Sequence, residues 1–122
     1  FPEVAFVSVD SIGKKIKVVN AIAESLGLSN LKAEHKRAES VEGQFDFVVS
    51  RAVTRTANFL PWVKDKIKKK SINERPNGYL FLKGGDLKEE LQEVRKKYTS
   101  FDIIDFFDNE FFETKKVIYM PN

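Results

Sequence analysis

A short run near the middle of the chain, residues 45–52 (FDFVVSRA), constrains the fold more than any other stretch. Residues 46–50 are predicted to form a strand that is apolar on both faces, because the apolar residues 47–49 follow one another without a polar interruption. Strands of this kind usually lie in the middle of a parallel sheet, with helices on either side. The run ends abruptly in Ser50-Arg51-Ala52. The sequence therefore predicts an α/β fold with a polar, cationic strand end.

Arg51 is the first candidate for a functional residue. In open α/β sheets, ligands bind just beyond the carboxyl ends of the strands. A guanidinium group held there offers a planar fork of donors to a carboxylate or a phosphate. An ordinary strand–loop junction with a solvated arginine explains this stretch equally well.

The amino-acid composition restricts the classes of protein and of functional site that remain. A length of 122 residues indicates one domain. The chain has no cysteine, which excludes disulfides and thiolate metal sites and fits a reducing, cytoplasmic compartment. Its one histidine, His35, argues against a histidine metal site or a Ser-His-Asp triad, and we expect a structural or solvated role for it. No apolar run approaches the roughly 20 residues that span a bilayer.

The N-terminal region predicts a strand followed by a helix. Residues 4–10 are expected to form a first buried strand that ends in Asp10, and Ser11 is a plausible N-cap. Apolar residues at helical spacing follow over residues 12–26, and Gly27 ends the helix. In nucleotide-binding α/β proteins, an acid at such a strand end accepts hydrogen bonds from ribose hydroxyls. Asp10 has the alternative of only capping the helix.

Two further segments continue the alternation of strands and helices. Residues 31–35 are predicted to form an edge-side strand that leads into the charged loop 36–39. After the central strand, Thr54 or Thr56 is a candidate cap for a helix whose apolar positions run through residues 59–67. This order favours a doubly covered parallel sheet.

Another apolar segment, residues 79–82, predicts a buried strand that ends in Lys83-Gly84-Gly85. Paired glycines allow the backbone to approach a ligand closely, and Lys83 places a positive charge beside them. This strand end is a second candidate for a binding site.

The last third departs from the alternation. Residues 98–107 and 114–119 are predicted to form two strands joined by an acidic connection rich in phenylalanine. Two strands without an intervening helix favour an antiparallel closing hairpin at the edge of the sheet. Lysines also crowd residues 64–70. Their positive charges would suit binding to nucleic acid, but a solvated helix end explains them more simply.

Four motifs together resemble a known family: residues 9–15 (VDSIGKK), 37–39 (RAE), 49–52 (VSRA) and 82–85 (LKGG). In this order and spacing, over essentially the whole chain, they are similar to bacterial methyltransferases known as glucose-inhibited division protein B. The resemblance implies S-adenosylmethionine-dependent methyl transfer to N7 of a guanine in small-subunit (16S) ribosomal RNA. The implied partner is that RNA or a ribosomal particle, with no membrane and no metal.

The resemblance also implies a fold. It is the class I S-adenosylmethionine-dependent methyltransferase fold, a Rossmann-like α/β sheet with an antiparallel C-terminal hairpin. Residues 1–122 would form a single domain, the C-terminal part of that fold, which lacks the first strand and its glycine-rich loop. The chain begins at Phe1 inside a strand-like pattern, so we expect a fragment. The strands at residues 4–10 and 46–50 would each lose a neighbour, which predicts self-association of the fragment or poor solubility.

Residue roles follow from the resemblance alone. Asp10 would hold the ribose of the cofactor, and Ala38 and Glu39 would lie along its adenine. Arg51 would lie near the methionine end of the cofactor or near the guanine. Lys83 and the Gly84-Gly85 turn would form the substrate-side rim. No catalytic base is expected, because N7 of guanine is nucleophilic without losing a proton.

Two other functions remain open at this point. Asp10 would also suit the ribose of a dinucleotide, which favours a nicotinamide-dependent oxidoreductase half-domain. The lysines would also suit a fragment that binds RNA without catalysis. The closing hairpin and the co-occurrence of the other motifs argue against the oxidoreductase.

Overall fold

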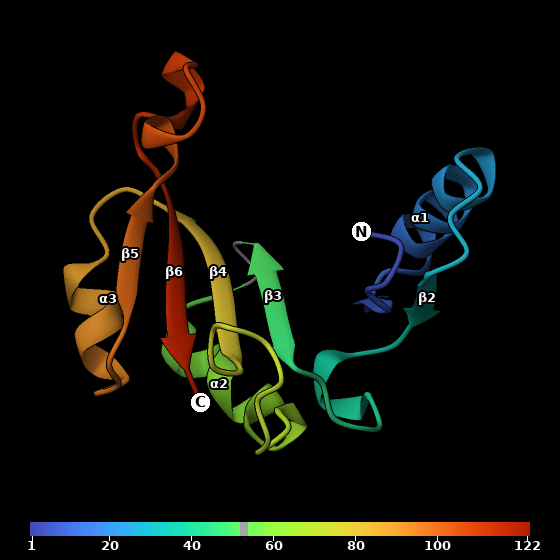
Figure 1. Ribbon diagram of the computed structural model, residues 1–122, viewed down its shortest axis with the longest axis horizontal. Coiled ribbons are helices and arrows are strands. Elements are labelled where there is room, and N and C mark those ends of the chain that lie inside the picture. The colour runs from blue at the N-terminus through green and yellow to red at the C-terminus, as the bar shows by residue number, and fades with distance from the viewer. Residues whose placement is uncertain (52–53) are drawn as a thin grey trace. The chain divides into compact units, whose positions relative to one another are not determined.

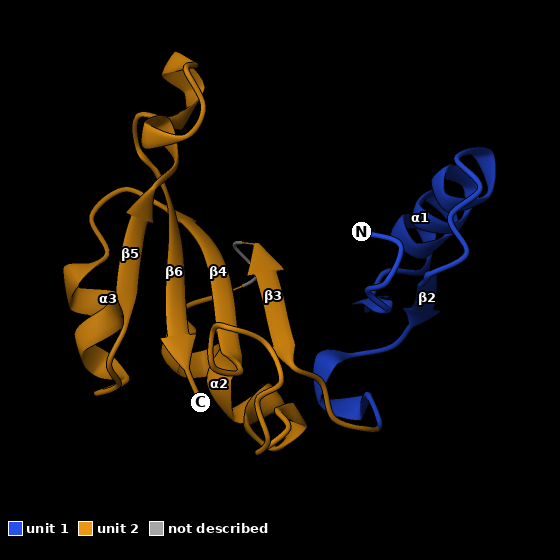
Figure 2. Ribbon diagram, viewed as in Figure 1, with its two compact units in different colours: residues 1–42 blue, residues 43–122 orange. Residues whose placement is uncertain are grey.

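The computed structural model describes residues 1–51 and 54–122 (Figure 1). Ala52, the last residue of the predicted strand end, lies outside the described residues. The chain divides into two compact units, residues 1–42 and residues 43–122 (Figure 2). Each unit is described by itself, and the single domain over residues 1–122 stays a prediction.

Unit 1 is a parallel βαβ motif. Strand β1 (Phe6–Asp10) pairs in parallel with β2 (Leu31–His35), in a register that sets Asp10 against His35. Helix α1 (Gly13–Ser25) connects them, and a short 3₁₀ turn, η1 (Ala38–Ser40), follows β2. Gly27 has a φ of +64°, so the glycine expected to end the helix adopts the left-handed backbone that favours this residue.

Two expectations for unit 1 are wrong. Strand β1 is not buried: the side chains of Phe6 and Val7 are 44% and 39% exposed. The physical reason is that β1 has only β2 as a hydrogen-bonded neighbour among the described strands. Ser11 is not the N-cap either, because that position belongs to Ile12. The carboxylate of Asp10 accepts a hydrogen bond from the backbone N–H of Ile12 instead.

Unit 2 contains a mixed four-stranded sheet in the order β3-β4-β6-β5. β3 and β4 are parallel, and β6 runs antiparallel to both β4 and β5. The predicted closing hairpin is therefore confirmed, with its last strand inserted between β4 and β5. Its first strand, expected over residues 98–107, is shorter, because a 3₁₀ turn begins at Ile103. The elements of unit 2 are β3 (Phe47–Arg51), α2 (Thr56–Val63), η2 (Lys64–Lys66), β4 (Gly78–Gly84), α3 (Lys88–Glu93), β5 (Thr99–Asp102), η3 (Ile103–Asp105), η4 (Glu110–Phe112) and β6 (Lys115–Pro121).

The main core lies along β4 and β6. Phe81 is 2% exposed and Ile118 1% exposed, and the ring of Phe59 on α2 meets Phe81 edge-on at 5.7 Å between centroids. Helix α2 thus covers one face of the sheet at its most apolar strands. Burial of such side chains contributes about 1.5–3 kcal/mol each.

Two expectations for unit 2 also need correction. Strand β3 is not the central strand that its apolar pattern predicted. It is an edge strand, as the expected loss of a neighbour implies, and Val49 is 62% exposed because the described strands supply no partner on its outer side. Helix α2 has Arg55 at its N-cap position, with no side-chain cap, and it ends at Val63, before Ile67. Pro61 lies inside this helix and lacks a backbone N–H, which limits its continuation. In the described part of the chain, no helix has the length and apolar character to cross a membrane.

Candidate functional site

In unit 1, the candidate cofactor residues lie at the carboxyl ends of the two parallel strands. Asp10 ends β1, and Ala38 and Glu39 lie in η1, shortly after β2 ends at His35. The backbone N–H of Lys36 donates to the carbonyl of Asp10 at 3.1 Å, which ties the two strand ends together. The expected grouping of Asp10 with Ala38 and Glu39 is therefore present in the backbone.

Asp10 has one carboxylate oxygen engaged and one available. Oδ1 accepts a hydrogen bond from Ile12 N at 2.8 Å, in the turn before α1, but α1 has Ile12 at its N-cap and no side-chain cap, so the helix-capping role weighed from sequence is not found. Within the described residues, no hydrogen bond to Oδ2 is found, and the residue is half-buried. A carboxylate that accepts from a backbone N–H is held in one orientation, and its second oxygen can accept from a ribose hydroxyl. The hydrogen bond to Ile12 and a contact with ribose are compatible, and the cofactor role stays a prediction.

His35 has a structural contact in unit 1. Its Nε2 lies 2.9 Å from the carbonyl oxygen of Ser11, and its ring lies against Gly13, where an added Cβ would come within 3.2 Å of Cε1. The ring thus fixes the loop between β1 and α1, next to Asp10. This agrees with the expected structural role.

In unit 2, the candidate substrate residues lie at the carboxyl ends of β3 and β4. Arg51 is the last residue of β3 and pairs in register with Leu82, so Lys83 and Gly84 extend just beyond it on the neighbouring strand. Arg51 is exposed, and it forms no ion pair with any residue that the structure describes. Its guanidinium is free to meet an anion or a base.

Lys83 differs from Arg51, because its ammonium is already engaged. Nζ lies 2.9 Å from Glu90 Oε2 and donates to the carbonyl oxygen of Thr54 at 2.9 Å. The same Glu90 oxygen accepts from Thr56 Oγ1 at 2.8 Å. The side chains of Lys83 and Glu90 are only 10% and 15% exposed. We call these four residues the Glu90 network; it joins β4, α3 and the start of α2, and it fixes the backbone at Thr54.

The electrostatics of the Glu90 network favour its charged form. Burial alone would raise the pKa of Glu90, but the hydrogen bonds from Lys83 and Thr56, with the charge of Lys83, lower that pKa below its usual value. A lowered pKa keeps the carboxylate ionised, and an ion pair at this degree of burial needs such hydrogen bonds to offset desolvation. The network is therefore a structural clamp, and a contact of Lys83 with substrate stays a prediction.

Sequence reasoning missed Glu90, although a signal was present. Glu90 is spaced three residues after Leu87 and one before Leu91, so helical periodicity places it on the apolar face of α3. An acid on an apolar face needs a cationic partner, and Lys83 ends the preceding strand. Nothing local identifies that partner.

No metal centre is found: in residues 1–51 and 54–122, no three histidine, aspartate or glutamate side chains are grouped closely enough to hold an ion. The candidate site residues that the structure describes instead carry the free Oδ2 of Asp10 and the exposed carboxylate of Glu39 in unit 1, and the free guanidinium of Arg51 in unit 2. Hydrogen bonding and charge are the chemistry that these residues provide.

Comparison with known proteins identifies relatives. The family model of rRNA small subunit methyltransferase G (GidB) matches residues 1–118. The ribosomal RNA small subunit methyltransferase G of Flavobacterium psychrophilum is 57% identical over 99% of this chain and 57% of its own length. Those of Flavobacterium johnsoniae and Parabacteroides distasonis are 54% and 52% identical, again over 99% of this chain and over 57% and 53% of their own lengths. The chain thus spans little more than half the length of these relatives.

Solved structures support the fold. An rRNA methylase from Streptococcus thermophilus superposes with a TM-score of 0.63 over 97% of this chain and 73% of its own, at 9% identity. A putative rRNA-methylase from Clostridium thermocellum gives a TM-score of 0.57 with the same coverage, at 14% identity. At these identities the likeness concerns the fold alone, and it confirms the expected class I methyltransferase fold. With its family model matched over residues 1–118, the chain belongs to the rRNA small subunit methyltransferase G (GidB) family.

Proposed function

We propose that the protein transfers a methyl group from S-adenosylmethionine to N7 of a guanine in small-subunit ribosomal RNA. Membership of the rRNA small subunit methyltransferase G family, over residues 1–118, carries the proposal. The location of candidate binding residues at carboxyl ends of parallel strands in both units supports it, since α/β sheets bind ligands there. The site of action would be the cytoplasm, and the partner would be ribosomal RNA, free or in a ribosomal particle.

In unit 1, the residues fit the nucleoside end of the cofactor. The free Oδ2 of Asp10 would accept hydrogen bonds from ribose hydroxyls, while its Oδ1 stays bound to Ile12 N. Ala38 and Glu39 in η1 would lie along the adenine. A carboxylate already held by a backbone donor loses little freedom on binding, which favours affinity.

In unit 2, the residues fit the reacting end. The exposed guanidinium of Arg51 would orient the methionine carboxylate or the guanine by a charge-assisted contact. Lys83 has one N–H left after Glu90 and Thr54, and with Gly84 it would line the substrate side. The Glu90 network would keep this strand end in place.

Methyl transfer to N7 of guanine requires little acid–base chemistry from the side chains. S-adenosylmethionine, when bound, supplies an electrophilic sulfonium methyl group. The lone pair on N7 of guanine needs no deprotonation, so the protein has no proton to remove and no general base is required. Positioning of the two reactants in line and electrostatic stabilisation by fixed groups remain as the contributions of the protein. Arg51 is accordingly a binding residue and not an acid or a base.

Two substitutions test the proposal. Asp10→Ala should weaken binding of S-adenosylhomocysteine, and Arg51→Ala should slow single-turnover methylation of 16S RNA. Each should be a roughly ten- to hundredfold effect, because each removes a charge-assisted contact worth about 1.5–3 kcal/mol. Calorimetric titration and incorporation of labelled methyl groups measure these effects. Calorimetric titration with NAD tests the oxidoreductase alternative: binding of NAD instead of S-adenosylhomocysteine would favour it.

Arg55→Ala is the matched control for Arg51, since Arg55 is an exposed arginine that pairs with Glu93 at 2.7 Å on the surface of unit 2. It should leave the methylation rate unchanged. An Arg51→Ala rate equal to that of the unaltered protein would remove Arg51 from the proposed site. Self-association also stays a prediction, because β1 and β3 each have one unpaired edge among the described strands; light scattering measures it.

A further inference from the structure

The end of unit 2 opposite to Arg51 and Lys83 is strongly basic. Strands β4 and β5 both run antiparallel to β6, so their amino ends lie at the same end of the sheet. The loop 68–77 leads into β4, and the turn 95–98 leads into β5. We call these two segments the basic edge. Its cationic residues are Lys68, Lys69, Lys70, Arg75, Arg95, Lys96 and Lys97, against the single acid Glu74.

The loop of the basic edge is held by internal hydrogen bonds. The buried side chain of Asn77 donates through Nδ2 to the carbonyls of Lys68 and Lys70, each at 3.0 Å. The hydroxyl of Tyr119, on β6, donates to the carbonyl of Pro76 at 2.6 Å. A backbone fixed in this way presents its lysines without a large ordering cost on binding.

The charges of the basic edge are available for an external partner. Lys69, Lys70 and Lys97 are exposed, and they form no ion pair with any described residue. Only Lys68 has an acidic partner, Asp46, at a long 3.8 Å. Unpaired cations in two separate segments suit a ligand with regularly repeated negative charge.

Arg75 is oriented by aromatic rings. Its guanidinium carbon lies 4.8 Å from the ring centroid of Tyr119 and 5.4 Å from that of Phe101. Cation–π contacts of this kind limit the movement of the guanidinium, and its N–H groups can still bind a phosphate from the solvent side. Arg75 is exposed, as this geometry requires.

A hollow adjoins these cations. Its volume is about 560 Å³, and it is lined by Lys96, Lys97, Tyr98, Thr99, Tyr119 and Pro121. Tyr98 is 41% exposed, so one aromatic side chain beside two lysines is accessible from solvent. Lysines interleaved with aromatic rings are typical of surfaces that bind nucleic acid, where phosphates meet the cations and sugars or bases meet the rings.

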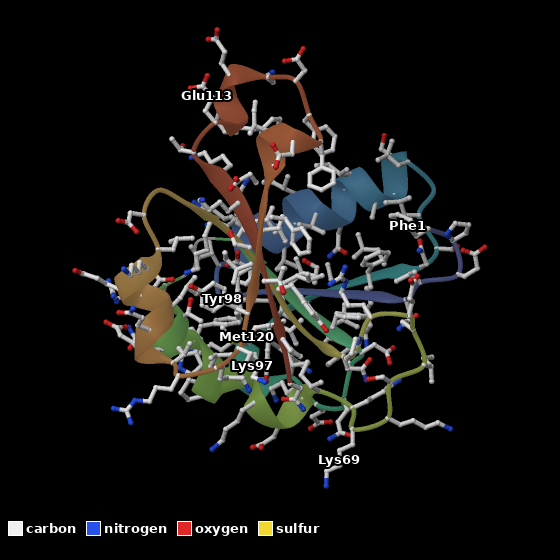
Figure 3. All side chains as sticks on the ribbon, turned by 60° about the vertical axis from the view of Figure 1, so that its left-hand side comes forward. Phe1, Lys69, Lys97, Tyr98, Glu113 and Met120 are labelled. Carbon is white, nitrogen blue, oxygen red and sulfur yellow. The ribbon has the colours of Figure 1, made fainter. Side chains whose placement is uncertain are left out.

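The opposite end of unit 2 has the reverse charge. Asp102 ends β5, and the connection between β5 and β6 carries Asp105, Asp108, Glu110 and Glu113. Figure 3 shows Glu113 at the top of the view and Lys69 at the bottom. The acidic connection lies at the same end of the sheet as Arg51 and Lys83. A polyanion near unit 2 is therefore attracted more strongly to the basic edge than to the end at which the modified base would bind.

We propose that the basic edge is a docking surface for the phosphate backbone of RNA. It is separate from the strand ends at Arg51 and Lys83, so it would hold a part of an RNA away from the base that is modified. Three features favour RNA over an acidic protein: unpaired lysines on two segments, an arginine fork held by aromatic stacking, and an accessible tyrosine in the adjoining hollow. The inference does not require methyl transfer, and its test measures binding alone.

The decisive experiment compares two sets of lysines. Fluorescence anisotropy measures binding of a labelled RNA hairpin across a series of salt concentrations. The variant K69Q/K70Q/K97Q should weaken binding about tenfold or more and reduce the slope of log affinity against log salt by about 2–3, since each lost phosphate contact reduces the slope by nearly one. The matched control K14Q/K15Q/K17Q removes the same charge from exposed positions of α1 and should change the slope little. Equal effects of the two variants would overturn the proposal.

A second variant separates geometry from charge. Arg75→Lys keeps the charge but removes the planar fork and its stacking, so affinity should fall about two- to fivefold while the salt slope stays constant. An affinity unaltered by Arg75→Lys would contradict a built phosphate site. The remaining test adds poly-glutamate or unlabelled RNA, at equal charge, as a competitor of the labelled RNA. If poly-glutamate displaces the labelled RNA as effectively as unlabelled RNA does, the proposal is overturned in favour of an acidic protein partner. Unchanged Trp62 fluorescence verifies the fold of each unit 2 variant.

Discussion

Units 1 and 2 both begin with a strand, a helix and a parallel strand, yet they differ in how much apolar surface they bury. In unit 2, Phe81 and Ile118 are 2% and 1% exposed. In unit 1, α1 buries Ile16 but leaves Ile22 54% exposed and Leu26 67% exposed. The same motif therefore gives a dense core in one unit and a thin one in the other.

The number of strands explains the difference. A two-stranded sheet with one helix can cover one face of each strand, and an isolated pair of strands is marginally stable. In unit 2, β6 enters between β4 and β5, so the central strands have neighbours on both sides and helix α2 against one face. An apolar sequence pattern thus favours burial of its side chains. Whether they are buried depends on the neighbouring strands.

The largest expected effect comes from two matched isoleucines. Ile118→Ala should destabilise unit 2 by about 2–5 kcal/mol, because it leaves a cavity in a packed core. Ile22→Ala in α1 should change stability by less than about 1 kcal/mol, since the side chain is exposed and alanine favours helix. Urea unfolding followed by fluorescence of Trp62, the single tryptophan, reports unit 2, and circular dichroism reports α1. Equal losses would show that α1 is covered in solution.

Substitution of two glycines, one in each unit, should give a smaller difference in stability between the units. A methyl group at Gly78 would lie 2.8 Å from Pro121 Cα and would also meet Met120 O, both in the backbone of the adjacent strand β6. Gly78→Ala should therefore cost about 3 kcal/mol by overpacking. Gly27→Ala meets no atom within 4 Å and should cost about 1 kcal/mol for its positive φ alone. Thermal unfolding measures both, and a more damaging Gly27→Ala would contradict the assigned packing.

The smallest contrast concerns two glutamates. Glu90→Gln should destabilise unit 2 by about 1–2 kcal/mol, less than the ~3–5 kcal/mol of a fully buried pair, because Lys83 and Glu90 keep some solvent contact. Glu34 in unit 1 pairs with Lys36 at 2.7 Å and Lys32 at 3.2 Å on the surface, so Glu34→Gln should have little effect.

The pH dependence sharpens this last contrast. Burial opposes the charge of Glu90, but hydrogen bonds from Lys83 and Thr56 lower its pKa in the folded state below the ordinary 4.5. As pH falls below 4.5, the unfolded chain takes up the proton first. The contribution of Glu90 is therefore complete above pH 4.5 and is lost as the pH falls through the lower folded pKa. Glu90→Gln should therefore reduce the change in the free energy of unfolding of unit 2 over this pH range, even in high salt. An unchanged pH dependence would show that the Glu90 network does not contribute to the stability of unit 2.

Much of the fold could be predicted from local pattern. Periodicity located the strands at residues 31–35 and 79–82 and the closing hairpin, and Gly27 marked the end of α1. The candidate site was harder. Asp10 and Arg51 were recognised because a charged residue directly after an apolar strand is a visible signal. Glu90 escaped notice because its partners, Lys83 and Thr56, come from other elements.

The sequence by itself determined where strands and helices form, since side-chain alternation, helical spacing and glycine conformation act over a few neighbouring residues. The four motifs also determined the family. Only the tertiary structure decided that β6 lies between β4 and β5 and that Lys83 is clamped by Glu90. Strand order and ion pairs depend on which distant segments meet, and that choice rests on burial and hydrogen bonding summed over the whole sheet.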